Sequence, residues 1–206
     1  MLSLAQNAQS FFCIEWIPTE NGPSVVNYNK IKLSNPLNFY KNFLDTVFNH
    51  ADFNFQNDSK TITLSLDINN VGIASFKYDS MIPLEDFRNW YEKKILGAYI
   101  VDNYDIYYYP LEDTKENIVM VIYINKEVKQ NILDSCLEHN CNLLHLTLDI
   151  FSANDSSKMF GSNSLSSYII WKIMKNNYHY ITYYKKGSLN HLIKVKKSKK
   201  LEIISS

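Results

Sequence analysis

The chain has 206 residues, of which 46% are hydrophobic and 20% are charged, and its formal net charge is zero. These values are typical of a globular protein and exclude a chain that is disordered throughout. The 15 Tyr and 11 Phe residues favour strands, so we expect a sheet-rich fold.

Neither a secretory leader nor a membrane helix is predicted. Met1–Ala8 lacks a basic start and a long apolar core. The longest apolar run, Ile118–Ile124, is far shorter than the roughly 20 residues that a membrane helix needs. The three cysteines show no disulfide-framework spacing, so we interpret them as reduced thiols. We therefore expect a cytoplasmic protein, with any membrane contact peripheral and at the inner face.

Charge is unevenly distributed along the chain. From Ser156 to the end there are ten lysines and one acid, Glu202, which gives a net charge of +9, whereas the first 155 residues carry −9. Such asymmetry is typical of a basic face that meets an acidic partner, or of molecules that associate head to tail. Lysines on solvated strand faces and in a frayed tail explain the same pattern, and both interpretations stay open.

The chain opens with a predicted three-strand meander and a helix. The strands are Leu2–Ala5, Phe11–Ile17 and Ser24–Leu33, and the turn signals lie at 19–23. Ser34-Asn35-Pro36 begins the helix, with a cap residue before a proline at the first helical position. Residues at helical spacing predict its buried face: Leu37, Tyr40, Phe43, Leu44, Val47 and Phe48.

After a polar loop at 52–60, two more strands are predicted at Thr61–Asp67 and Gly72–Tyr78. Pro83 begins the next helix, and we expect Gly97 to end it in the usual C-terminal position. The apolar stripe of this helix is formed by Leu84, Phe87, Tyr91 and Ile95.

Strands at Tyr104–Tyr109 and Asn117–Ile124 follow, joined by an acidic turn. Asn125 is expected to cap a third helix, with Asn140 as the left-handed residue at its end. Its buried face holds Val128, Ile132 and Cys136, and the following strand alternates through Leu144, Leu146, Leu148 and Ile150.

Ser152–Ser167 is rich in Ser and Asn and is the predicted domain boundary. Beyond it we expect three strands, Tyr168–Met174, Tyr178–Lys185 and Leu189–Lys196. The turns between them are predicted at 176–177 and 186–188.

This order of elements resembles that of the actin-like ATPases of the PilM type, which are similar in turn to FtsA and to the cytoplasmic domain of GspL. The resemblance covers most of residues 1–155 and rests on Phe87–Lys93, Asn117–Tyr123, the helix end at Asn140, and Leu146–Asn154. It implies an α/β fold with an actin-like (ribonuclease H-like) first lobe over 1–152. A ferredoxin-like α+β insert would occupy about 58–150, and a truncated, β-rich and basic second lobe 153–206.

The phosphate-binding motifs of that family are missing. Members that bind ATP carry Asp-x-Gly after the first strand, where the Asp serves the metal and the Gly lets the backbone approach the phosphates. Ala5-Gln6-Asn7 stands in that place here, and Tyr168–Met174, in the place of the second motif, has neither acid nor glycine. No hydrolase motif is present either. We therefore predict no catalytic, cofactor-binding or metal-binding residue, and no cofactor.

Two other patterns suggest binding sites. Cys136, His139, Cys141 and His145 have a spacing that zinc sites use, but the predicted helix and strand faces separate them, so we interpret them as a buried thiol and surface histidines. The run Tyr107–Tyr109 could stack bases. It lies in the acidic half, far from the lysines in sequence, so we interpret it as sheet packing.

The sequence thus predicts a non-catalytic adaptor or scaffold that binds protein partners in a membrane-associated assembly. Pilus assembly or secretion is what the resemblance implies. A partner peptide would dock at a groove or sheet edge of the acidic lobe, and the basic segment that ends in Lys194–Lys200 would meet a neighbouring subunit or anionic lipid. A nucleotide-binding actin-like ATPase with divergent phosphate loops remains an alternative. So does a nucleic-acid-binding protein that uses the basic C-terminal segment.

Overall fold

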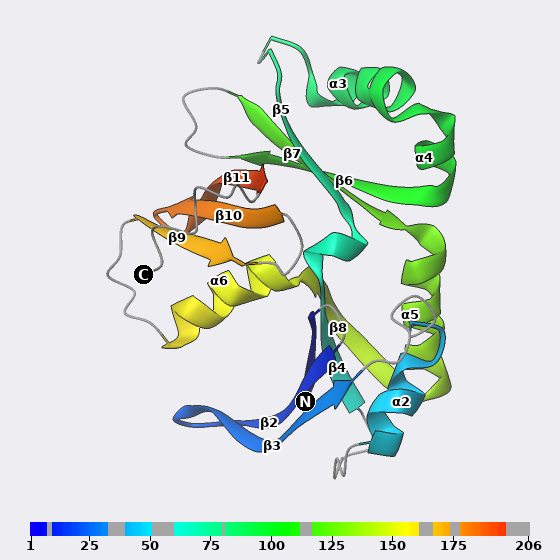
Figure 1. Ribbon diagram of the computed structural model, residues 1–206, viewed down its shortest axis with the longest axis vertical. Helices are drawn as coiled ribbons and strands as arrows, with labels where there is room; N and C mark the ends of the chain where they lie inside the picture. Colours follow the sequence, from blue (N-terminus) through cyan, green and yellow to red (C-terminus); the bar gives the residue numbers. More distant parts are fainter. Residues whose placement is uncertain are drawn as a thin grey trace. The chain divides into compact units, whose positions relative to one another are not determined.

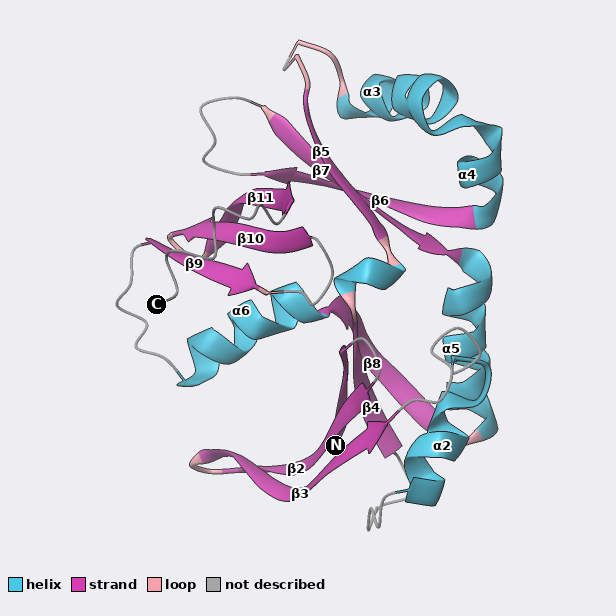
Figure 2. Ribbon diagram, viewed as in Figure 1, coloured by secondary structure: helices cyan, strands magenta, loops and turns pink. Residues whose placement is uncertain are grey.

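The computed structural model describes residues 1–7, 10–32, 40–50, 60–79, 81–111, 117–160, 167–173 and 178–196. The chain divides into two compact units (Figures 1 and 2). The first comprises Met1–Gly72, Leu96–Ile106 and Tyr123–Ser152, and the second comprises Ile73–Ile95, Tyr107–Ile122 and Ala153–Ser206. The lobe limits predicted from the sequence, at 152/153, stay predictions.

Five strands form the larger sheet in the order β3-β2-β1-β4-β8. The predicted meander is confirmed, because β1 (Leu2–Asn7), β2 (Ser10–Thr19) and β3 (Gly22–Lys32) pair in antiparallel succession. By contrast, β4 (Lys60–Leu66) runs parallel to β1 and to β8 (Cys141–Leu148). The carboxyl ends of β1, β4 and β8 therefore lie at one edge of the sheet.

Two helical segments and α5 lie together beside this sheet (Figure 1). The two segments are η1 (Tyr40–Asn42) and α2 (Phe43–His50). The third element, α5 (Lys126–Glu138), contacts both of them and also β8. The ion pair of His139 Nε2 with Asp45 Oδ1, at 2.9 Å, joins α5 to α2. The predicted buried faces are confirmed at Tyr40, Phe43, Leu44, Val47, Ile132 and Cys136, whereas Leu37 lies outside the described residues.

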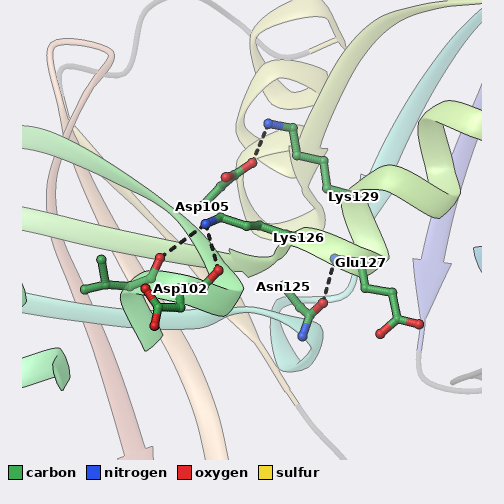
Figure 3. A network of polar contacts seen from close by, with 7 residues as sticks. Asp102, Asp105, Asn125, Lys126, Glu127 and Lys129 are labelled. Carbon is green, nitrogen blue, oxygen red and sulfur yellow. Dashed lines mark hydrogen bonds and ion pairs between the residues drawn. The ribbon is translucent and has the colours of Figure 1, made fainter. Parts of the chain in front are cut away.

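Polar contacts fix the start of α5 (Figure 3). Asn125 Oδ1 accepts hydrogen bonds from two backbone N–H groups of the first turn, at 2.8 and 3.3 Å, which confirms the predicted cap. Lys126 Nζ donates to carbonyls at the end of α4 (Gly97–Asn103), the nearer being that of Asp102 at 2.8 Å. Lys129 forms an ion pair with Asp105 at 2.6 Å. Lys126 thus complements the carbonyl end of α4, whereas Lys129 ties α5 to β6 (Tyr104–Leu111).

A smaller sheet has the order β5-β7-β6, formed by β5 (Gly72–Lys77), β7 (Ile118–Asn125) and β6 (Tyr104–Leu111). The strands predicted near the two ends of the ferredoxin-like insert, at about 58–150, pair into the five-stranded sheet as β4 and β8. The three strands between them form the smaller sheet, and the insert itself stays a prediction.

Gly97 has the left-handed conformation that is predicted for the residue at the end of the second predicted helix. After α3 (Leu84–Tyr91) the chain makes a π-helical turn, η3 (Glu92–Leu96), and Gly97, with φ +75°, begins α4. The wider turn rotates Ile95 away from the stripe that Phe87 and Tyr91 form, so Ile95 is 51% exposed. The predicted apolar stripe was wrong at Ile95 because the extra residue in the π turn has no local sequence signal.

The strand predicted through Leu144 and Ile150 also differs. The pairing of β4 with β8 skips Leu144, which is half-exposed as the additional residue of a bulge. The strand stops at Leu148, and the buried Ile150 belongs to α6 (Asp149–Phe160). This helix runs through the first part of the predicted domain boundary at Ser152–Ser167, as far as Phe160.

The three C-terminal strands are confirmed as β9 (Ser167–Lys172), β10 (Tyr178–Lys185) and β11 (Ser188–Lys196). They form an antiparallel sheet in the order β11-β10-β9. Lys186 and Gly187 turn the chain with φ of 51° and 82°, which is typical of a tight hairpin. The turn predicted at 176–177 lies outside the described residues. No helix in the described part of the chain is long and apolar enough to span a membrane.

We predict that Gly72→Ala destabilises the protein. A Cβ on Gly72 would lie 1.9 Å from two ring atoms of Tyr123, whose ring also packs edge-on against Tyr104. Overpacking of this kind typically costs about 1–3 kcal/mol of unfolding free energy, which urea denaturation measures. In a Tyr123→Ala background the same substitution should cost less than half as much. An equal cost in both backgrounds would contradict the steric explanation.

Candidate functional site

A candidate site lies at the carboxyl ends of the parallel strands β1, β4 and β8. In the sheet, the strand that follows β1 in the chain, β2, lies on one side of the β1–β4 pair, whereas β8 lies on the other side, next to β4. In open α/β sheets, ligands bind outside the carboxyl ends of strands at such a switch of direction. Here Gln6 is the next-to-last residue of β1, Asp67 follows β4, and Asp149 follows β8.

A closed set of side chains fills the edge between β1 and β4. We call Gln6, Tyr40, Asp67 and Asn70 the Gln6 cluster. Gln6 Oε1 accepts hydrogen bonds from the Tyr40 hydroxyl, from Asn70 Nδ2 at 2.6 Å and from the Asp67 backbone N–H at 3.4 Å. Asn70 Nδ2 also donates to the Tyr40 oxygen at 2.9 Å. Gln6, Tyr40 and Asp67 are all buried.

Asp67 has a structural task within this cluster. Its Oδ1 accepts from the backbone N–H and from the side-chain amide of Asn69, each at 2.9 Å, and so caps η2 (Ile68–Asn70). That short turn places Asn70 against Gln6 and Tyr40. The buried carboxylate is thereby engaged in holding the cluster, which is neutral at its centre.

The Tyr40 hydroxyl is held in its protonated form. Burial raises the pKa of Tyr40, by more than its hydrogen bonds with Gln6 and Asn70 lower it. A phenol that keeps its proton and two amides supply neither a nucleophile nor a base at neutral pH, and Oδ1 of Asp67, the carboxylate of the cluster, is engaged in capping η2. The cluster therefore holds the chain together at the place where a phosphate-binding loop would stand.

The sequence motif scan missed this cluster. The sequence predicts the position of Ala5-Gln6-Asn7 and a buried Tyr40, but it does not connect them with each other or with Asn70. The available signal was the polar run that follows the strand, Asp67-Ile68-Asn69-Asn70, in which Asp and Asn commonly cap a turn.

The four residues with zinc-type spacing are not brought together. Cys136 is buried in α5, Cys141 donates to the His139 carbonyl at 3.5 Å, His139 pairs with Asp45, and His145 is exposed on β8. Within the described residues, no group of three or more His, Cys, Asp or Glu is placed to hold a metal ion. Burial raises the pKa of Cys136 to about 11 and that of Cys13 to about 12, so neither is a ready nucleophile.

The tyrosine run divides between two faces of β6. The Tyr108 hydroxyl donates to Glu92 at 2.9 Å, its ring meets Tyr91 edge-on, and the Arg88 guanidinium lies 4.9 Å from the ring centre. Tyr107 and Tyr109 are exposed. Tyr108 therefore takes part in packing, as interpreted from the sequence.

One edge of the five-stranded sheet carries exposed apolar side chains. β3 is the edge strand, and Val25, Val26, Tyr28 and the adjacent Ile17 of β2 are each at least half exposed. Val26 is the additional residue of a bulge, because the pairing passes from Asn27 to Val25. Bulges commonly interrupt the edges of sheets, and an exposed apolar edge marks a surface where another chain can pair.

No protein-family model matches this chain, and no curated protein matches it. Solved structures match over nearly its whole length. A chain of the PilM–PilN type IV pilus biogenesis complex has a TM-score of 0.63 at 10% identity, over 97% of this chain and 62% of that one. The cytoplasmic domain of EpsL, an inner membrane component of the type II secretion system of Vibrio cholerae, has a TM-score of 0.58 at 10% identity, over 100% and 74%.

A third match is a protein of unknown function with an actin-like ATPase fold from Bacteroides thetaiotaomicron, with a TM-score of 0.49 at 14% identity, over 98% of this chain and 72% of that one. The first two matches establish a mixed α/β fold like that of these proteins, which confirms the predicted resemblance. At such identities the likeness concerns the fold alone. The chain spans less than two thirds of the chain from the pilus complex.

Replacing Tyr40 with Phe tests the Gln6 cluster. At neutral pH we expect a loss of about 0.5–1.5 kcal/mol of unfolding free energy, because one buried hydrogen-bond group is removed. Since the pKa of Tyr40 is raised in the folded state, the unfolded chain binds fewer protons above about pH 10, and stability falls as pH rises further.

Urea denaturation between pH 7 and 11 should show that the unfolding free energy falls less steeply with pH in Tyr40→Phe than in the unmodified chain. The exposed Tyr99 provides the matched control, because Tyr99→Phe should leave the neutral stability within about 0.5 kcal/mol. Identical alkaline slopes for the unmodified chain and Tyr40→Phe would contradict the assignment.

Proposed function

We propose that this chain is a non-catalytic adaptor or scaffold that binds protein partners in a membrane-associated assembly of the pilus-assembly or secretion type. The setting is supported by likeness of fold to a chain of a pilus biogenesis complex and to a cytoplasmic domain of a secretion-system component. We propose the same setting for this chain, on the cytoplasmic side of the membrane.

The Gln6 cluster is the observation that carries the non-catalytic part of the proposal. A nucleotide at the β1–β4 edge needs backbone that approaches its phosphates and a carboxylate that serves its metal ion. An amide stands at Gln6, and its oxygen is already shared among Tyr40, Asn70 and the Asp67 backbone. Opening the cluster would leave buried polar groups without partners, which costs about 1–3 kcal/mol for each group.

The β3 edge supports the binding part of the proposal. An extended peptide of a partner protein could add a strand beside β3, with main-chain hydrogen bonds supplying affinity and side-chain contacts supplying specificity. The exposed Val25 and Tyr28 offer apolar contacts on such a surface. Binding of this kind needs no nucleotide and no catalytic residue.

A titration of the purified protein with Mg-ATP tests the non-catalytic part. We expect no heat in calorimetry and no thermal shift at millimolar nucleotide, because the Gln6 cluster is closed. Micromolar binding would overturn this part of the proposal and would favour the actin-like ATPase with divergent loops. In that case Asp67→Asn should weaken the binding, since Asp67 is the carboxylate in the cluster.

Deleting the gene in its host tests the role in assembly. We expect surface pili or secreted proteins to be lost, and expression of the unmodified chain to restore them. Expression of a Tyr28→Glu variant should restore less, because a charge would replace an exposed apolar contact on β3. Normal surface assembly in the deletion strain, together with a purified protein that is monomeric, would overturn the proposal.

A further inference from the structure

The geometry points to a second docking surface, on the sheet formed by β9, β10 and β11. We propose that one face of this sheet binds a single amphipathic helix of a partner protein that is apolar along one side and acidic on its flanks. The inference rests on the proposed function, because it names a surface and a partner chemistry for an adaptor. We call this face the open face and define it by Ile169, Trp171, Ile181, Tyr183, His191 and Ile193.

The strand register assigns residues to the two faces of the sheet. Residues directly opposite one another across a ladder share a face. Ile169 lies opposite Tyr183, Trp171 lies opposite Ile181, and β11 adds His191 and Ile193 in the same register. The open face is therefore one continuous surface that spans all three strands.

The other face is already covered. Tyr180, Thr182 and Tyr184 on that face are buried, although they come from the same central strand as the open face. The Tyr168 ring stacks on Tyr184 with a centroid distance of 5.1 Å, and its hydroxyl donates to Asn154 of α6. This face of the sheet is thus buried, and α6 contacts it through Asn154.

Much of the open face is exposed, although His179, which shares its register, is buried. Ile169 is 63% exposed, Trp171 is 51% exposed and Ile193 is 50% exposed. Trp171 also packs edge-on against His179 at 5.9 Å, which orients the indole within the face. A sheet with two apolar faces needs a packed layer on each, and a large exposed apolar surface is typical of an interaction site.

The positive charge beside the open face indicates that the flanks of the partner helix are acidic. The described residues of this sheet carry five lysines and no carboxylate, and three of them, Lys172, Lys194 and Lys196, lie in the register of the covered face. Lys185 shares the register of the open face, and Lys186 lies in the adjoining turn. A helix with carboxylates near its end would place them by these two cations and His191.

The dimensions fit one helix. Three strands at a spacing of about 4.8 Å span about 10 Å, close to the diameter of a helix with its side chains. A six-residue strand is about 20 Å long, which corresponds to about 13 helical residues. A partner helix of that length would therefore cover the open face.

A lipid surface and a second copy of this chain fit less well. Lys172 and Lys194 share the register of the covered face, and Lys194 lies 4.6 Å from the ring centre of Tyr178 on that side, so the cations do not surround the open face as an anionic bilayer would require. Among the described helices of this chain, the longest is α5, and it already buries the side that holds Ile132 and Cys136.

Fluorescence anisotropy with two labelled peptides tests the inference on the full chain. The acidic probe is a synthetic 14-residue helix with leucines along one side and glutamates on the flanks, and the basic probe has lysines in place of the glutamates. We expect micromolar binding of the acidic probe and at least tenfold weaker binding of the basic one. The double variant Lys185→Glu with Lys186→Glu should reverse or abolish that preference.

Variants of the exposed side chains supply the structural control. Ile169→Ser and Trp171→Ser should each weaken binding of the acidic probe at least tenfold, whereas Leu137→Ser, which alters a 73% exposed leucine on α5, should not. All three residues are at the surface, so thermal unfolding of each variant should stay close to that of the unmodified chain.

Several results would overturn the inference. They are absence of binding at millimolar peptide, equal binding of both probes, or binding that Trp171→Ser does not change. Trp171-dependent capture on vesicles of phosphatidylcholine with 30% phosphatidylserine, without peptide binding, would assign the face to lipid. A dimer in sedimentation that Trp171→Ser dissociates would assign it to a second copy. Micromolar Mg-ATP binding would contradict the proposed function without changing the peptide result. Failure of the proposed function and failure of the docking surface are therefore distinguishable.

Discussion

β4 pairs in parallel with β1 on one side and with β8 on the other, and this pairing constrains the rest of the first unit. Parallel neighbours cannot be joined by a tight hairpin, so each connection must leave the sheet and return. The first connection contains β2, β3 and α2, and the second contains the smaller sheet and α5. Both faces of β4 are largely buried as a result, which explains its core of Ile62, Leu64 and Leu66.

The same pairing brings polar residues to one edge, where each needs a partner. Buried polar groups are costly unless they are hydrogen-bonded. Gln6 Oε1, the Tyr40 hydroxyl and Asn70 Nδ2 form hydrogen bonds with one another, whereas Gln6 Nε2 is buried without a hydrogen-bond partner among the described residues. Asp67 caps the turn that carries Asn70. The edge that could open to a ligand is thus used to join β1, η1 and η2.

The two proposed docking surfaces use different physical interactions. At the β3 edge, backbone N–H and C=O groups of an edge strand can form hydrogen bonds with another chain. The bulge at Val26 limits how far such pairing can extend. On the open face of β9–β11, the main chain is already paired, so binding would come from apolar burial around Trp171 and from the nearby cations. An adaptor with both surfaces could hold an extended peptide and a helix at the same time.

The sequence by itself determined the features whose signals are local. Examples are the bounds of Tyr178–Lys185, the Asn125 cap, the left-handed Asn140 and the absence of Asp-x-Gly at Ala5-Gln6-Asn7. Periodicity, capping chemistry and motif content all act within a few residues, so they can be read without the fold. Only the tertiary structure decided that β4 and β8 join the larger sheet, that a π turn exposes Ile95, and that Gln6 is closed off by Tyr40 and Asn70. Tyr40 and Asn70 lie 34 and 64 residues from Gln6, and contacts across such separations depend on which strands pair.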